Sequence, residues 1–104
     1  MNSFDEREQA FESKYAHDQD MQFKAAARTN KLLGFWAAEK LGKTGDAAEA
    51  YAKEVVISDL DEPGHEDVVR KVAADLGDKS SADEIRSKMN ELRREAKKQV
   101  MKEA

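Results

Sequence analysis

The residues of this chain that could do chemistry are few and scattered. Gly42-Lys43-Thr44 has the ending of a phosphate-binding loop, but such a loop needs another glycine five residues before its last one, where this chain has Ala37. A phosphate loop also opens a helix, so that backbone amides point at the anion, whereas this triplet closes an expected helix. We therefore interpret the stretch as a helix-capping turn.

Metal ligands are equally sparse. Asp59 and Asp61 have the spacing of the first two ligands of a calcium loop, but the fifth position is Pro63. The twelfth position is Arg70 in place of a bidentate glutamate. The two histidines are far apart, and the chain has no cysteine to complete a zinc site. With no recognisable Ser/His/acid set either, we predict neither a metal site nor an enzyme.

The composition favours a small helical protein. The 104 residues are enough for one domain with a modest core. One proline and five glycines suit helices joined by short turns better than a β protein. No apolar run approaches the roughly 18 residues of a membrane span, and the acidic start MNSFDERE is unlike a targeting peptide. We expect a cytoplasmic protein that does not insert into membranes and is a monomer when free.

Helix signals divide the chain into four segments, separated at Gly42–Gly45, at Pro63-Gly64 and at Gly77. Apolar residues recur at three- and four-residue spacing within each segment. This pattern predicts an all-α four-helix bundle with an unusually long first helix. The predicted helices span about 4–41, 46–61, 65–76 and 82–102.

Helix starts and buried faces follow from the same pattern. A short polar residue with an acid three positions later indicates a capping box. The predicted capping boxes are Ser3/Glu6, Asp46/Glu49 and Ser81/Glu84. The predicted apolar faces are Ala25, Leu32, Leu33, Phe35, Trp36 and Leu41 in the first helix; Ala47, Ala48, Tyr51, Ala52, Val55 and Val56 in the second; Val68, Val69, Val72, Ala73 and Leu76 in the third; and Ile85, Met89, Leu92, Ala96 and Val100 in the last.

The first helix is too long for this bundle. Over positions 4–41 it would extend about 57 Å, against about 30 Å for the last helix. The whole net charge of −4 also lies within positions 1–20, which contain six acidic and two basic residues. We predict a mobile segment at 1–19, helical when bound, and a four-helix bundle at 20–104.

Three aromatic residues give the 1–19 segment a binding stripe. Phe4, Phe11 and Tyr15 are spaced by seven and four residues, which places them on one side of a helix. Ordering the segment alone costs more entropy than these rings return, so a partner that covers the stripe would complete its folding. The alternative is that the segment folds back on its own bundle.

The last helix is basic, with seven Lys or Arg against four acids. A basic helix can bind phosphates. However, these charges surround a regular apolar face, and the protein as a whole is acidic. We interpret them as the solvated surface of the bundle, with a docking face as one use, and predict no nucleic-acid binding.

Residues 4–15, FDEREQAFESKY, resemble the N-terminal inhibitory region of the alphaproteobacterial zeta subunit, the inhibitor of the F-type ATP synthase. The resemblance covers nearly the whole chain and is weakest over the last predicted helix, which matches mainly as an amphipathic helix. The other stretches that carry it are 21–25, 28–38, 42–45, 50–56 and 66–72.

This resemblance implies a protein that binds the alpha, beta and gamma subunits of the synthase's catalytic head and blocks ATP hydrolysis. Phe4, Phe11 and Tyr15 would be the buried anchors, and Arg7 and Lys14 could pair with acids of the partner. The bound protein would lie at the inner face of the plasma membrane. Some members of the family also bind adenine nucleotides weakly, without a residue set that can be transferred to this sequence, so no cofactor is required. The alternative functions are an ADP/ATP-binding helical sensor and a nucleic-acid accessory protein.

Overall fold

The computed structural model describes residues 19–59 and 65–103, and this part of the chain contains helices without any strand. The predicted all-α class with four helices is therefore confirmed. The part of the first helix predicted at 4–18 lies outside the described residues. The four helices are α2 (Gln19–Lys40), α3 (Gly45–Ser58), α4 (Glu66–Leu76) and α5 (Ala82–Glu103), with a short 3₁₀ turn, η1 (Gly77–Lys79), between the last two.

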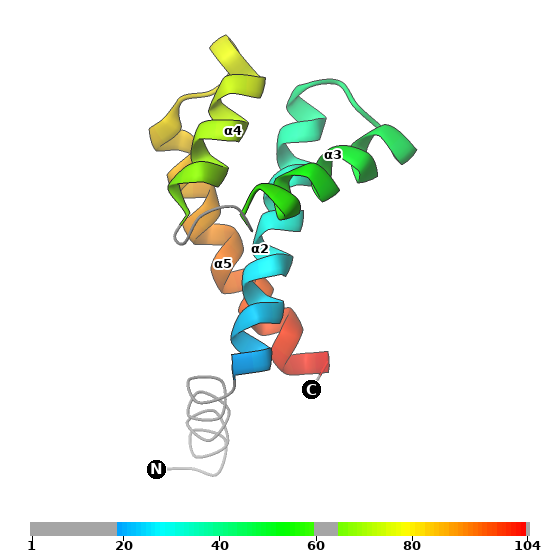
Figure 1. The fold of residues 1–104 in the computed structure, drawn as a ribbon, viewed down its shortest axis with the longest axis vertical. Coiled ribbons are helices and arrows are strands. Elements are labelled where there is room, and N and C mark those ends of the chain that lie inside the picture. Colours follow the sequence, from blue (N-terminus) through cyan, green and yellow to red (C-terminus); the bar gives the residue numbers. More distant parts are fainter. Residues whose placement is uncertain (1–18, 60–64, 104) are drawn as a thin grey trace.

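Helix α2 is the centre of the fold, because it packs against all three other helices. α5 lies beside α2 and runs in the opposite direction, so that the C-terminus comes back to the beginning of α2 (Figure 1). α3 crosses the later half of α2 at a steep angle, and α4 lies beside the beginning of α5 (Figure 1). The bundle is thus two long antiparallel helices with two shorter helices gathered at one end.

The main core lies at the end where all four helices meet. Leu33, Val55, Val72 and Ile85, one from each helix, are completely shielded from solvent. Such a core forms because each helix presents one apolar stripe, and its burial contributes roughly 25 cal/mol of favourable free energy per Å² of apolar surface. The buried members are Leu33, Ala37, Ala38, Ala48, Tyr51, Val55, Val68, Val69, Val72, Leu76, Ile85 and Met89.

A second, smaller cluster joins the other ends of α2 and α5. Met21 and Ala25 pack against Val100, with Met101 at the edge. The same ends are also joined by Arg28, whose guanidinium donates to Gln99 Oε1 at 2.8 Å and pairs with Glu103 at 2.8 Å. α2 is therefore held to the bundle near both of its ends.

The crossing of α2 and α3 depends on Gly34. A Cβ atom at this position would lie 2.6 Å from the Cα of Ala52 and 3.1 Å from its Cβ. Contacts this close to backbone atoms are not tolerated, so only glycine allows α3 to approach α2 as it does.

The predicted faces were largely confirmed, although one of the predicted residues is exposed and several are only partly buried. Ala47 is exposed, because α3 turns Ala48 and Tyr51 toward the core instead. The residues that are only partly buried are Leu32, Phe35, Trp36, Leu41, Val56, Ala73 and Leu92.

The predicted helix ends were partly correct. Gly42 and Gly77 have positive φ angles and end α2 and α4, and the Lys43 amide donates to the Ala38 carbonyl at 2.9 Å in the capping turn. The Asp46/Glu49 capping box is wrong, because α3 begins one residue earlier, with Thr44 as its N-cap and no side-chain capping bond.

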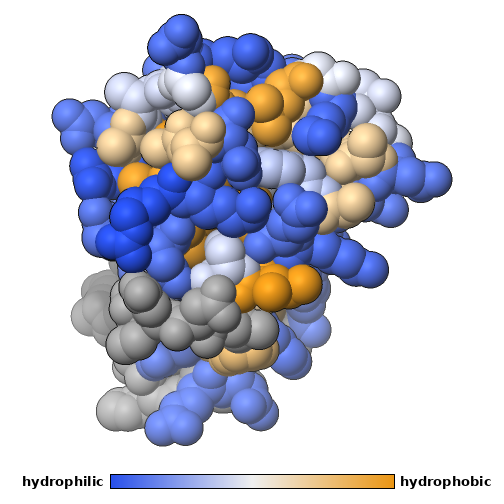
Figure 2. All heavy atoms as spheres, turned by 45° about the horizontal axis from the view of Figure 1, so that its top comes forward, coloured by the Kyte–Doolittle hydropathy of each residue, from blue (hydrophilic) through white to orange (hydrophobic). Residues whose placement is uncertain are grey.

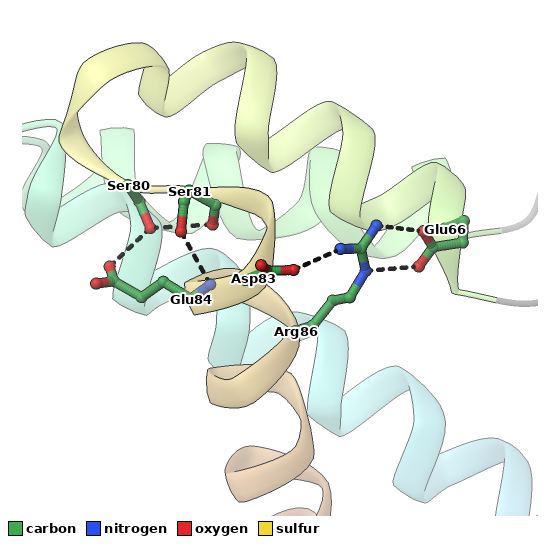
Figure 3. A network of polar contacts seen from close by, with 6 residues as sticks. All are labelled: Glu66, Ser80, Ser81, Asp83, Glu84 and Arg86. Atoms are coloured by element: carbon green, nitrogen blue, oxygen red, sulfur yellow. Dashed lines mark hydrogen bonds and ion pairs between the residues drawn. The ribbon is translucent and has the colours of Figure 1, made fainter.

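The Ser81/Glu84 capping box forms in one of its two halves. The Glu84 amide donates to Ser81 Oγ at 3.1 Å, as predicted. The Glu84 carboxylate does not return to the Ser81 amide, and instead accepts a hydrogen bond of 2.7 Å from Ser80 Oγ (Figure 3). The Ser3/Glu6 pair lies outside the described residues.

Candidate partner-binding site

The five residues predicted to bind a partner, Phe4, Arg7, Phe11, Lys14 and Tyr15, lie outside the described residues. The described part begins at Gln19, which is the first residue of α2 and the last residue of the segment predicted at 1–19. Any partner that holds the segment therefore meets the surface of α2 and its neighbours next. That surface carries an apolar groove, a polar pocket and two networks of polar contacts.

An apolar groove lies between α2 and α3. It has a volume of about 540 Å³. Phe35, Val56 and Ile57 form its apolar walls, and the buried Ala52 lies beneath them. Ile57, which forms one of these walls, remains 58% exposed.

Positive charge lines the groove. Lys31 of α2 and Lys53 of α3 both border it, and neither forms an ion pair with any residue in the described part of the chain. Glu49 is the one acid among the lining residues. The groove thus combines apolar walls with unpaired cations, a combination that suits an amphipathic acidic segment.

Phe23, on α2, is a second exposed apolar side chain, in addition to Ile57 of α3. It is 67% exposed and precedes Lys31 by a little more than two helical turns. Space filling shows a hydrophilic surface interrupted by several apolar patches (Figure 2). A contiguous apolar patch, rather than a single exposed side chain, marks an interaction surface, so the groove is the stronger candidate.

A smaller polar pocket of about 210 Å³ lies between α2 and α5. The buried Asn30 and Thr29 are among its lining residues, and the Thr29 hydroxyl donates to the Ala25 carbonyl at 2.7 Å. His65 and Arg93 complete the polar lining. This set provides hydrogen-bonding groups but no nucleophile paired with a base.

Tyr51 belongs to a polar network that fastens α3 to α4. Its hydroxyl donates to Asp75 at 2.9 Å, and Lys71 pairs with the same carboxylate at 3.1 Å. Burial raises the pKa of Tyr51 far above its usual value, and the hydrogen bond to Asp75 adds to that increase. Because these groups are already paired with each other, the network has a structural role.

The junction between α4 and α5 is held by exposed ion pairs (Figure 3). Arg86 contacts Glu66 at 2.6 Å and Asp83 at 3.0 Å. The hydrogen bond from Arg86 lowers the pKa of Glu66 below its usual 4.5, and the Ser80 hydroxyl lowers the pKa of Glu84 in the same way. These contacts use Arg86 within the fold, in agreement with the interpretation of the basic helix as solvated bundle surface.

Metal and membrane sites are not found in the described part of the chain. No group of three or more His, Asp or Glu side chains lies close enough together there to hold a metal ion. None of the described helices combines the length and apolar character of a membrane span. Of the residues weighed as a calcium loop, Asp59 caps the end of α3, whereas Asp61 and Pro63 lie outside the described residues.

The groove was missed by sequence reasoning, although a signal was present. Val55-Val56-Ile57 places three large aliphatic residues in a row, and a single helix face cannot bury all three. Likewise, Phe23 does not share the buried stripe of its helix. Large apolar residues that are out of phase with the core could have indicated the surface in advance.

Comparison with known proteins gives a consistent result. The family model for ATPase inhibitor subunit zeta matches residues 1–99 of the chain. A structure determined by solution NMR is 57% identical in sequence, covers 81% of this chain and 99% of its own, and superimposes with a TM-score of 0.75. No curated protein matches the chain at a significant level.

Proposed function

The chain belongs to the ATPase inhibitor subunit zeta family, and on this premise we propose that it inhibits ATP hydrolysis by the F-type ATP synthase through its N-terminal segment. The segment at 1–19 enters the catalytic head as a helix and acts as a wedge. It blocks rotation in the hydrolytic direction, without chemistry of its own. The observation that carries this proposal is that the family match includes the N-terminal residues as well as the bundle.

The residue pattern of the segment supports a wedge. Phe4, Phe11 and Tyr15 occupy one side of the expected helix, and buried aromatic side chains dominate the binding energy of most protein interfaces. Arg7 and Lys14, seven residues apart, share another side and pair with acids of the partner. The partner surfaces are those of the alpha, beta and gamma subunits in the catalytic head.

The described bundle supports this mechanism because it gives the N-terminal segment a folded body to which it is anchored. Contacts near both ends of α2, at Met21–Val100 and at Leu33–Ile85, fix the helix to the folded body. A wedge that continues directly into α2 is therefore attached to a rigid object too large to follow it into a narrow interface. The bundle stays outside the head, on the cytoplasmic side of the membrane, and prevents the wedge from passing through or turning.

Weak adenine nucleotide binding stays a prediction and is not needed for the wedge. Gly42-Lys43-Thr44 forms a capping turn at the end of α2, so it is not the place where phosphates would bind. A titration with ADP and ATP, followed by backbone amide shifts, tests this separately. Saturable shifts without synthase binding would favour the sensor function.

Deletion of residues 2–19 tests the proposal. The truncated protein should keep its helical circular dichroism and the fluorescence of Trp36, yet should lose inhibition of the isolated catalytic head. A chain in which positions 2–19 are scrambled is the matched control, because it keeps the length, composition and charge of the segment. The proposal fails if the truncated or scrambled protein inhibits as well as the natural sequence.

A further inference from the structure

The groove between α2 and α3 is an apolar surface that no described residue covers. Val56 and Phe35 are half-buried in its walls, while Ile57 is 58% exposed. Phe23, nearer the start of α2, is 67% exposed but is not one of the residues that line the groove. Burial of such side chains is favourable by roughly 25 cal/mol per Å², so a segment of matching shape would bind there.

The positive charges around the groove favour the binding of an acidic segment. Lys24, Lys31 and Lys53 are exposed and have no ion-pair partner among the described residues. Positions 1–20 of the same chain hold six acids against two bases and account for its whole net charge. Asp5, Glu8 and Glu12 would lie along one edge of the aromatic stripe in a helix. An acidic segment with three rings therefore matches an apolar groove bordered by lysines.

The length of the N-terminal segment also matches the distance along α2 that it must span. Gln19, the first residue of α2, and Lys31, which borders the groove, are separated by about 18 Å along the helix axis. Phe4 and Tyr15 would be separated by about 16.5 Å if their segment were helical. Positions 16–18 connect Tyr15 to the start of α2 at Gln19, and connections of this length commonly join antiparallel helices. A helix running back along α2 would place Tyr15 near the start of α2 and Phe4 at the level of Lys31, at the edge of the groove.

We propose that in the free protein residues 4–15 bind to the α2–α3 groove of their own chain, with the aromatic stripe toward Phe35, Val56 and Ile57. Because the segment is tethered, its effective concentration at the groove is of millimolar order, which favours it over a second copy in dilute solution. The groove then competes with the partner for the same rings. This consequence for inhibition rests on the proposed function, whereas the intramolecular contact does not.

The contact can be measured directly in the full chain. The protein has no cysteine, so Ser13→Cys carries a single nitroxide label on the side of the segment opposite the rings. We expect the amide signals of Lys31, Lys53 and Ile57 to lose most of their intensity, and this loss should not change on dilution. If these amides lose no more intensity than those of η1, at the far end of α4, the proposal is overturned. Broadening that appears only between labelled and unlabelled molecules also overturns it, because a second copy then occupies the groove.

Groove variants make the test specific. Lys31→Glu combined with Lys53→Glu should remove the intensity loss at the groove, as should the exposed Ile57→Ser. Lys79→Glu combined with Lys98→Glu makes the same change in net charge at exposed positions away from the groove and should preserve the loss. Equal loss in all variants would overturn the proposal.

Inhibition kinetics separate this proposal from the proposed function. The groove variants release the segment, so they should inhibit the catalytic head with a several-fold faster onset than the natural protein. Slower or weaker inhibition by these variants would overturn self-docking, since the groove would then serve the partner. Intensity loss at the groove together with no inhibition by any variant would uphold self-docking and refute the inhibitory function.

Discussion

Substitution of Gly34 by alanine tests the helix crossing that shapes the whole bundle. The added Cβ would lie 2.6 Å from Ala52 Cα, whereas ordinary contacts begin at 3.4 Å, so α3 must move by about 0.8 Å. Because the nearest atom belongs to the backbone, no side-chain rotation relieves the clash. The cost should be near the upper end of overpacking effects, about 3 kcal/mol.

Helix propensity acts in the opposite direction. Alanine in the interior of a helix is more favourable than glycine by about 1 kcal/mol. We therefore expect Gly34→Ala to lower the free energy of unfolding by about 2 kcal/mol in total, since the clash outweighs the propensity gain. For a domain of this size, that corresponds to a decrease in Tm of roughly 8–16 °C.

Thermal and urea unfolding, monitored by circular dichroism, measure this effect. Ala26→Gly, at a half-buried position of α2 away from the crossing, provides the matched control for propensity and should cost only about 1 kcal/mol. An increase in Tm for Gly34→Ala would refute the reasoning, because it would mean that propensity dominates and that α3 does not lie so close to α2.

Three further predictions concern single contacts. Leu33→Ala, in the centre of the core with no exposed area, should cost about 2–5 kcal/mol in urea unfolding, and a loss below this range would show that the site collapses around the cavity. Tyr51→Phe should cost about 0.5–1.5 kcal/mol through the lost bond to Asp75 and should abolish the late-ionising tyrosine in an alkaline absorbance titration; persistence of that component would contradict the assignment. Arg86→Ala should destabilise the protein at neutral pH, but this difference should disappear as the pH falls below 4.5, because the depressed pKa of Glu66 stabilises the fold only while its carboxylate is ionised. A difference that persists in acid would contradict the last prediction.

Helix number and type follow from the sequence because the local signals agree with one another. Glycines at 42 and 77 both end helices with a positive φ, and the apolar spacing of α4 and α5 identifies residues that are buried in the fold. The start of α3 was placed one residue late, because Asp46 and Glu49 have the capping pattern but Thr44 occupies the N-cap position without a side-chain bond. Local patterns locate a helix more reliably than its first residue.

Side-chain burial at the crossing could not be predicted in the same way. Phe35 and Trp36 are the large aromatic residues in their part of α2, yet alanines 37 and 38 are the residues buried there. The reason is the distance between two helices, which depends on Gly34 meeting Ala52 of a different helix. Out-of-phase apolar residues such as Ile57 indicate an exposed surface, but the groove itself is formed by residues of two helices, which periodicity along one helix does not place together.

The predicted binding residues, unlike the helices and their buried faces, are not tested by the structure. Phe4, Arg7, Phe11, Lys14 and Tyr15 were identified from their spacing and from a family resemblance, and they lie outside the described residues. Membership of the zeta family confirms the class of protein to which this segment belongs. The action of each side chain stays a prediction that binding experiments must test.

The most direct test of the wedge is the rate of ATP hydrolysis by the isolated catalytic head at increasing concentrations of the full chain and of a Phe4→Ala, Phe11→Ala, Tyr15→Ala variant. We predict saturable inhibition by the natural sequence and its loss in the variant, with the same helical content in both proteins. Hydrolysis that continues at full rate in the presence of excess natural protein would contradict the account, as would equal inhibition by the variant.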